Sequence, residues 1–214
     1  MKENKYLLPT GLLLLMLVLL TILFGEMAIY FLDLNRLIYK DLSEQLTLQQ
    51  IEAFFENKKR WAWVGYLVMP VLLFLKITGI AWVLGIGGFF SDISLAHKRY
   101  FRIVLISEYI FLIPALVKFG WFYFVETDFS FDQVQQFVPF SLQSVFNTTN
   151  VPQWAMYPLQ LINLFEVAYW LLLAYLIDKA TRTTKGIKIV LTGYAPALFI
   201  WVVFIMFLTL NYTP

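Results

Sequence analysis

The residues of this sequence best placed to do chemistry are ionisable side chains inside long apolar stretches. They are Glu26, Lys76, Glu108, Lys118 and Glu166. A charged group in the middle of a bilayer carries a large desolvation cost, so it is expected to face other helices and to find a partner there. We therefore treat these residues as the start of a candidate buried polar cluster.

The position of each charge along its apolar stretch predicts its partner. Lys76 and Glu166 both lie near the middle of their stretches, whereas Glu26 and Lys118 lie toward the same outer side. Charges at matching depths can pair inside a helical bundle. We predict the pairs Lys76–Glu166 and Glu26–Lys118, with Glu108 paired to a base of one of the inner loops.

A polar stripe extends this cluster. Gln160, Asn163, Glu166 and Tyr169 recur at every third position. On one continuous helix this spacing gives a slowly drifting stripe that should face other helices or a water-filled cavity. Two interpretations stay open: hydrogen bonds and an ion pair that fix helix packing, or a binding site for a solute, an ion or a lipid headgroup.

The composition excludes several kinds of chemistry. The chain has no cysteine and one histidine, which rules out thiol nucleophiles, disulfides and multi-histidine metal or haem sites. It contains no P-loop, nucleophile elbow or metal-ligand spacing. We predict no cofactor, no bound metal and no enzyme activity. The net charge of +2, without a basic motif, also predicts no nucleic-acid partner.

The elements that position these residues are predicted to be membrane-spanning helices. Hydrophobic residues make up 60% of the chain and charged residues 14%, against about 45–50% and about 25% in soluble domains. A helix needs about 20 mainly apolar residues to cross a bilayer. Stretches of this length occupy residues 7–32, 61–90, 102–125, 154–177 and 189–210. The sequence therefore predicts one all-α domain, residues 1–214, a polytopic membrane helical bundle with about five transmembrane helices.

The connections between these spans differ in character. Residues 47–59 begin with a capping-box pattern at Thr47 and Gln50 and are predicted to form an amphipathic surface helix. Residues 126–153 are rich in phenylalanine and are predicted to form a loop at the membrane interface. Internal prolines that can kink a helix lie in three spans, at Pro70, Pro114 and Pro196.

The distribution of Lys and Arg predicts a cytoplasmic N-terminus and an external C-terminus. Lys2, Lys5 and two later basic loops then lie inside, and the group Lys58–Arg60 opposes this orientation. The basic loops are predicted to contact anionic lipid or a partner. The residues concerned are Lys98, Arg99, Arg102, Lys179, Arg182 and Lys185.

Several short elements occur in order between residues 61 and 210. They are a Gly-rich end of the second span, a basic loop leading into Ser107-Glu108-Tyr109 and Pro114, the element Asn163-Leu164-Phe165, then Trp170, and a basic turn from Lys179 to Lys188. The closing span is rich in Trp and Phe. In this arrangement the chain resembles the Yip (Ypt-interacting protein) family, in particular its bacterial members. The resemblance implies a non-enzymatic five-span membrane protein, and it assigns no functional residues.

These observations predict a Yip-like integral membrane protein of a bacterial cytoplasmic membrane. It is expected to act as a membrane organiser or as a partner subunit of a larger membrane complex, in contact with the bilayer and with a membrane protein or a second copy of itself. The alternative is a small transporter, or a permease subunit of an ATP-driven exporter, that uses the buried charges. The last span carries no charged residue and is expected to be the more lipid-facing or partner-facing helix.

Overall fold

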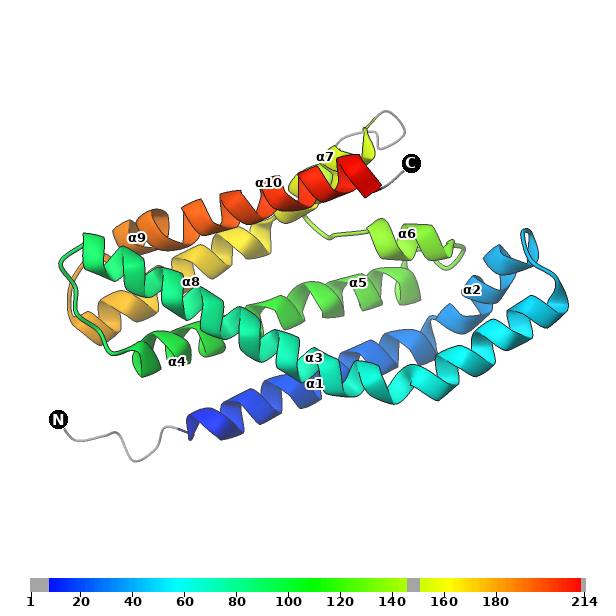
Figure 1. The fold of residues 1–214 in the computed structure, drawn as a ribbon, viewed down its shortest axis with the longest axis horizontal. Coiled ribbons are helices and arrows are strands. Elements are labelled where there is room, and N and C mark those ends of the chain that lie inside the picture. The colour runs from blue at the N-terminus through cyan, green and yellow to red at the C-terminus, as the bar shows by residue number, and fades with distance from the viewer. Residues whose placement is uncertain (1–7, 146–150, 213–214) are drawn as a thin grey trace. The chain divides into compact units, whose positions relative to one another are not determined.

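The computed structural model describes residues 8–145 and 151–212, and every regular element in these ranges is a helix (Figure 1). Helical segments long and apolar enough to cross a membrane are Thr10–Phe31, Leu48–Phe90, His97–Phe124 and Gly186–Asn211. Helices suit lipid because they pair their backbone polar groups internally. The chain therefore folds as a helical bundle of the multi-pass membrane type. Lys2, Lys5 and residues 146–150 of the predicted interfacial loop lie outside the described residues.

The chain forms two compact units. Unit 1 comprises Met1–Leu75 and Ala115–Phe137, and unit 2 comprises Lys76–Pro114 and Val138–Pro214. The boundaries fall within two helices, α3 (Leu48–Phe90) and α5 (Leu112–Phe124).

Unit 1 contains α1 (Thr10–Phe31), α2 (Leu34–Ser43), α6 (Phe131–Gln136) and the adjoining parts of α3 and α5. Asp33 takes the left-handed conformation, with φ of 47°, and turns the chain from α1 into α2. A small core forms where Leu32, Phe122 and Val134 are buried against surrounding aromatic rings. About half of the residues of α1 are exposed, and its one buried residue is Leu17.

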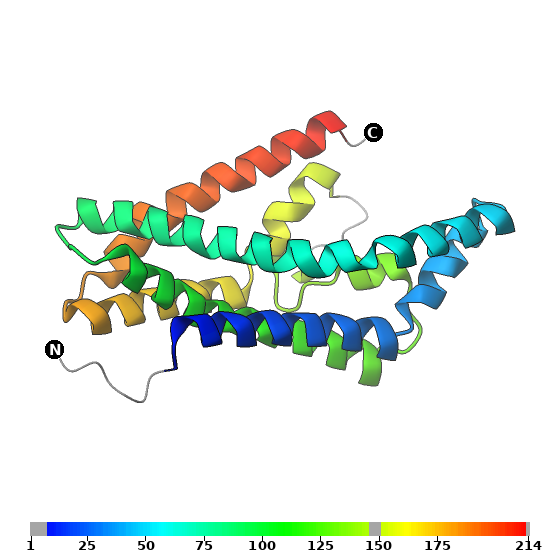
Figure 2. The ribbon, with the colours of Figure 1, turned by 60° about the horizontal axis from the view of Figure 1, so that its bottom comes forward.

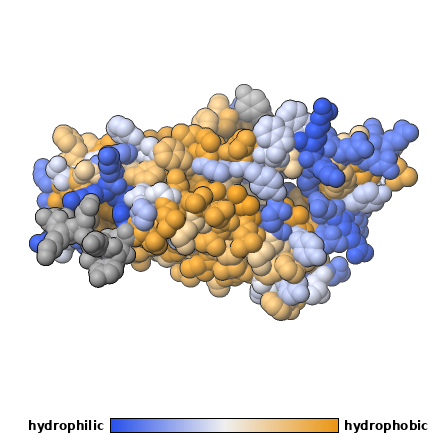
Figure 3. Space-filling view, turned by 90° about the horizontal axis from the view of Figure 1, so that it is seen from below, coloured by the Kyte–Doolittle hydropathy of each residue, from blue (hydrophilic) through white to orange (hydrophobic). Residues whose placement is uncertain are grey.

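Large hydrophobic side chains cover much of the exposed surface, as the face drawn in Figure 3 shows. Leu15, Leu19 and Leu23 on α1 are examples, each exposed by half or more. A water-soluble protein rarely exposes so large an apolar area, so this surface fits a lipid environment.

The segment at residues 47–59 differs from its prediction. The capping contact is present, because the Thr47 backbone N–H donates to Gln50 Oε1 at 3.0 Å. However, the helix that begins there runs without a break to Phe90, through Pro70, as the 43-residue α3. The segment is thus the start of a long helix rather than a separate surface helix. The helix α2 before it was not predicted at all.

Unit 2 contains the rest of α3, α4 (His97–Glu108), η1 (Tyr109–Phe111), η2 (Leu142–Val145), α7 (Gln153–Leu161), α8 (Leu164–Thr181), α9 (Gly186–Ile189), η4 (Val190–Tyr194) and α10 (Ala195–Tyr212). The helix through α4 and α5 tightens to a 3₁₀ turn at η1, just before Pro114. Proline has no N–H and its ring crowds the preceding turn, which explains the local change.

Two glycines bring α3 close to η4, which is a turn of π-helix. A Cβ on Gly87 would collide with the Ile189 carbonyl oxygen, and a Cβ on Gly193 with the Val83 carbonyl oxygen. Glycine is therefore required on both sides of this crossing. Gly87 lies inside α3, three residues before the helix ends at Phe90, and serves packing.

The predicted fourth span, residues 154–177, is not one helix. The helix α7 ends at Leu161 and a new helix, α8, begins at Leu164. Figure 2 shows α7 turning away from the direction of α8, and it packs beside α10. The backbone at the break is held by an antiparallel bridge between Ser141 and Asn163, with Leu142 N–H donating to Ile162 O at 2.9 Å.

The last span is not uniformly exposed. Its first turns are packed inside unit 2, where Ile189, Val190 and Tyr194 are buried. Its second half exposes Phe199 and Phe207. The expectation that this span is the more lipid-facing or partner-facing helix therefore holds only for its second half. The more exposed helix is α1, whose one buried residue is Leu17.

Candidate functional site

Unit 2 holds an ion pair next to aromatic rings. Lys76 Nζ lies 2.8 Å from Glu108 Oε2. The ammonium group also lies over the Phe111 ring, 4.7 Å from its centre, which adds a cation–π attraction. The Glu108 side chain is 3% exposed, whereas the Lys76 side chain is 48% exposed. The carboxylate is thus enclosed by protein and its cation is only partly so.

The second oxygen of Glu108 is also engaged. The Tyr169 hydroxyl donates to Glu108 Oε1 at 3.0 Å, and Tyr169 is fully buried. The Tyr169 ring packs against the rings of Phe111 and Tyr194, at centroid distances of 4.9 Å and 5.6 Å. Tyr169 therefore links the ion pair to the next buried carboxyl group.

That next group is Glu166, which has neutral partners only. Its Oε1 accepts hydrogen bonds from Trp170 Nε1 and from the Tyr194 hydroxyl, both at 2.8 Å. The residue is 8% exposed. Both contacts end on one oxygen, and no described residue donates a hydrogen bond to Glu166 Oε2. We call Lys76, Glu108, Glu166, Tyr169, Trp170 and Tyr194 the buried carboxyl network.

Asn163 holds the two half-helices of the fourth segment together. Its side-chain Oδ1 accepts from the Glu166 backbone N–H at 2.9 Å, which caps the start of α8. Its Nδ2 donates to the carbonyl oxygens of Gln160 and Leu161, at 2.9 and 3.1 Å, and so pairs the end of α7. One amide therefore satisfies backbone groups that the break would leave open.

The break also sets the electrostatics of Glu166. Glu166 lies in the first turn of α8, where the positive end of the helix dipole favours a negative charge. Lys76 and Glu108 both act electrostatically on its carboxyl group, in opposite directions. The network thus contains two carboxyl groups and one fixed cation. One more positive charge, a proton or a small cation, would make it neutral.

The structure brings together half of the predicted polar cluster. Lys76, Glu108, Glu166 and Tyr169 meet in the network, and Asn163 adjoins it. Gln160 lies on α7 beyond the break, so the predicted stripe is not continuous. The predicted pair Lys76–Glu166 was wrong, because Lys76 pairs with Glu108. The predicted base for Glu108 was wrong for the same reason.

Glu26 and Lys118 lie in unit 1, outside the network. Glu26 is exposed and accepts a hydrogen bond from the Tyr66 hydroxyl at 2.6 Å. Lys118 is partly buried on α5. Their predicted ion pair was wrong, because no salt bridge joins these two described residues and Glu26 instead accepts from Tyr66.

The basic residues of the two predicted contact loops take different positions in unit 2. Lys98 and Arg99 are exposed on the first turn of α4, and Arg102 is partly buried one turn later. Lys179 lies over the Tyr175 ring, and Arg182 ends α8 in the left-handed conformation. Lys185 donates to the Ser91 carbonyl oxygen at 2.9 Å, so it ties two loops together.

Sequence reasoning missed Trp170, Tyr194 and Phe111. Trp170 lies four residues after Glu166 on the same helix face, and this spacing was a usable signal. Tyr194 and Phe111 come from distant segments, and their approach depends on the Gly87–Gly193 crossing and on the 3₁₀ turn. Within residues 8–145 and 151–212, no three His, Asp or Glu side chains gather as a metal site.

No protein-family model, no curated protein and no solved structure matches this chain. The resemblance to the Yip family therefore stays a prediction.

Proposed function

We propose that this protein is a non-enzymatic membrane transport protein, acting alone or as a subunit, that uses a proton or a small monovalent cation. The buried carboxyl network is its ion site, and Glu166 Oε2 is the atom that takes up the ion. In this proposal α7 and α8 together make a fifth crossing of the membrane, beside the four unbroken helical segments.

The observation that carries the proposal is the state of the two carboxyl groups. Glu108 is satisfied at both oxygens, by Lys76 and by Tyr169. Glu166 is also buried, yet its two neutral donors meet at Oε1. A buried carboxylate without a cation is costly in lipid, so uptake of a positive ion at Oε2 is favoured.

The broken fourth segment supports the same proposal. Transporters commonly place ion and substrate sites where a membrane helix is interrupted, because the free helix ends offer partial charges there. Here the break at Ile162–Asn163 puts the start of α8 directly before Glu166. Irregular backbone at such a depth requires protein or water around it, and Ser141 supplies part of that support.

A second candidate is the Yip-like organiser or partner subunit of a larger membrane complex. It is favoured by the second half of α10, which exposes large apolar side chains. They are Phe199, Ile200, Trp201, Val203, Phe204, Phe207 and Leu210. Lipid would cover such a surface as well as a partner protein would, so the surface does not favour a partner over lipid. Glu166 Oε2, by contrast, has no donor among the described residues and favours a bound ion. We therefore rank transport first.

The test is ion uptake by the full-length protein in sealed proteoliposomes. A potassium diffusion potential drives uptake, with a trapped pH dye in one set of vesicles and a sodium-sensitive dye in another. We expect uptake of protons or of sodium above that of protein-free vesicles. Glu166→Gln, which removes the charge with little change in size, should lower this uptake by at least about tenfold, or about 1.4 kcal/mol.

Glu26→Gln is the matched control, because Glu26 is also a carboxyl group within an apolar helix but lies outside the network. It should leave uptake unchanged. Uptake of neither ion above protein-free vesicles, or equal uptake by the Glu166→Gln protein, would contradict transport and leave the organiser as the better proposal. Unfolding midpoints in detergent establish that each variant is folded.

A further inference from the structure

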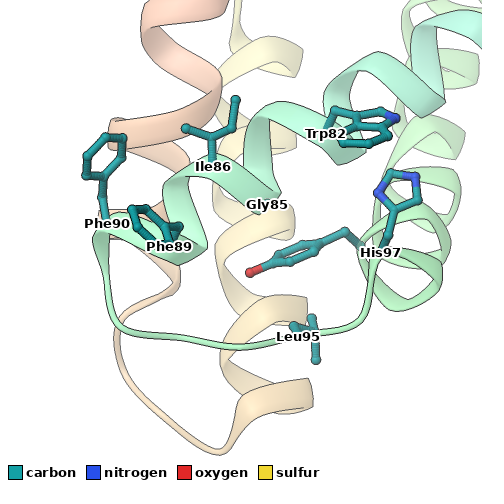
Figure 4. Close-up of a pocket in the computed structure, with 8 residues that line it drawn as sticks. Trp82, Gly85, Ile86, Phe89, Phe90, Leu95 and His97 are labelled. Carbon is teal, nitrogen blue, oxygen red and sulfur yellow. The ribbon is translucent and has the colours of Figure 1, made fainter.

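Unit 2 carries an apolar groove at the turn between α3 and α4, away from the residues of the buried carboxyl network. Its walls include Trp82, Gly85, Ile86 and Phe89 of α3 together with His97 and Tyr100 of α4 (Figure 4). The groove encloses about 350 Å³. This is within the range of small-molecule sites, which are mostly apolar with a few polar groups.

The groove exists because Gly85 has no side chain. Trp82, Gly85, Ile86 and Phe89 follow one another at helical spacing on one face of α3, so a larger residue at position 85 would fill the space between its neighbours. Figure 4 shows bare backbone at Gly85, with the Trp82 and His97 rings beside each other at one end. The centres of these two rings are 5.0 Å apart.

One end of the groove meets a site suited to an anion. His97, which lines the groove, is also the first residue of α4. Ala96 provides no side-chain cap for this helix start, and the first turn carries Lys98 and Arg99 and no acid. Positive side chains at the positive end of a helix oppose its dipole, unless an anion is bound there.

Tyr100 forms part of the groove wall. The residue is 2% exposed, and its hydroxyl packs against Gly88, where a Cβ would collide with it. The groove therefore offers an apolar wall and an anion site at one end.

We propose that this groove binds one anionic phospholipid, with the phosphate at the start of α4 and an acyl chain along Trp82, Gly85 and Ile86. An acyl chain fits the apolar wall, and the negative phosphate complements the basic, uncapped start of α4. The acyl chain of a zwitterionic lipid also fits the wall, but its headgroup has no net charge to complement the helix start. This proposal is independent of ion transport.

The test compares two lipids on the purified full-length protein by native mass spectrometry. The protein is equilibrated in detergent with equal amounts of phosphatidylglycerol and phosphatidylcholine of the same acyl chains. We expect one retained phosphatidylglycerol, favoured over phosphatidylcholine by at least about tenfold, because basic residues attract anionic lipid headgroups. The double variant Lys98→Gln with Arg99→Gln should remove this preference.

Filling the groove provides the second arm. A Cβ at Gly85 meets no atom within 4 Å, so Gly85→Leu fills the space without a backbone collision and should lower lipid retention at least about tenfold. Gly79→Leu, on the same helix and equally unobstructed, is the steric control. The double variant Lys59→Gln with Arg60→Gln, from a basic group elsewhere on α3, is the charge control. Both controls should retain lipid as the unaltered protein does.

Several outcomes would overturn the proposal. Equal retention of the two lipids would show that the start of α4 does not recognise the phosphate. Unchanged retention in the Gly85→Leu protein would show that the acyl chain does not lie in the groove. Displacement of the lipid by inorganic phosphate, with no requirement for an acyl chain, would show an anion site only. A lipid-free dimer that Gly85→Leu dissociates would assign the groove to a second copy of the chain.

Discussion

The two units of this protein provide different environments for a carboxyl group in an apolar helix. In unit 1, Glu26 is exposed and has one hydrogen bond, from the Tyr66 hydroxyl. In unit 2, Glu166 is buried, lies at a helix start and accepts from both Trp170 and Tyr194. The same residue type is thus a surface group in one unit and part of a connected interior in the other.

The glycines of the two units differ in the same way. Gly25 in α1 faces open space, whereas Gly87 and Gly193 in unit 2 touch backbone across a helix crossing. Close backbone packing excludes lipid and water from the neighbouring side chains. A charged side chain there cannot be solvated by water, so it is stable only with partners from the protein or with a bound ion. The surroundings of a charge in a membrane helix, rather than its presence, therefore indicate a site.

The largest expected effect comes from adding a single methyl group at the helix crossing. Gly193→Ala places a Cβ against the Val83 carbonyl oxygen, so the π-helical turn and α3 must separate. We expect a loss of about 3 kcal/mol in the free energy of unfolding, at the upper end for overpacked sites. Denaturation by a harsh detergent in mixed micelles measures this. Gly25→Ala should not destabilise the protein. Equal losses of unfolding free energy in the two variants would contradict the difference in packing between the two units.

The ion pair gives the next largest effect. Glu108→Leu leaves the Lys76 ammonium without its carboxylate and the Tyr169 hydroxyl without its acceptor. We expect a loss of about 2 kcal/mol, less than for a fully enclosed pair because Lys76 is half exposed. The same unfolding assay applies. Adding Lys76→Met should recover part of the loss, and strict additivity of the two changes would show that the residues do not interact.

Asn163 tests whether the helix break is built by one side chain. Asn163→Ala removes the cap of α8 and the donors to the end of α7, which should cost about 1–2 kcal/mol. Asn163→Asp keeps the Oδ1 acceptor and should be closer to the unaltered protein. Hydrogen exchange should locate the loss at the first turn of α8. Protection there that is unchanged in Asn163→Ala would mean that the break is held by the Ser141 bridge alone.

The smallest effect is expected from the tyrosine hydroxyls that donate to the two carboxyl groups. Tyr194→Phe removes one donor to Glu166 Oε1 and should lower the free energy of unfolding by about 0.5–1 kcal/mol. Tyr66→Phe removes the donor to Glu26 and should leave the unfolding midpoint where it was. A larger loss from Tyr66→Phe than from Tyr194→Phe would reverse the order of the two units.

Much of the helical architecture follows from the sequence, because a run of about 20 apolar residues has few other folds available. Thr47 and Gln50 also marked the start of α3. The break at Asn163 was not predictable, since the apolar run is continuous and one amide side chain decides the outcome. The Lys76–Glu108 pair was missed because depth along a span says nothing about which face a residue occupies. Tyr194 was missed because its approach depends on glycine packing between distant helices.

Infrared difference spectroscopy of the protein in lipid, with ¹³C-labelled glutamate, tests most directly whether the Glu166 carboxyl group takes up an ion. Spectra are compared at two pH values, and with and without sodium. We expect a glutamate carboxyl signal that responds to one of these changes, is lost in Glu166→Gln and persists in Glu26→Gln. A response that survives in Glu166→Gln, or the absence of any buried carboxyl response in the unaltered protein, would contradict the proposed ion site.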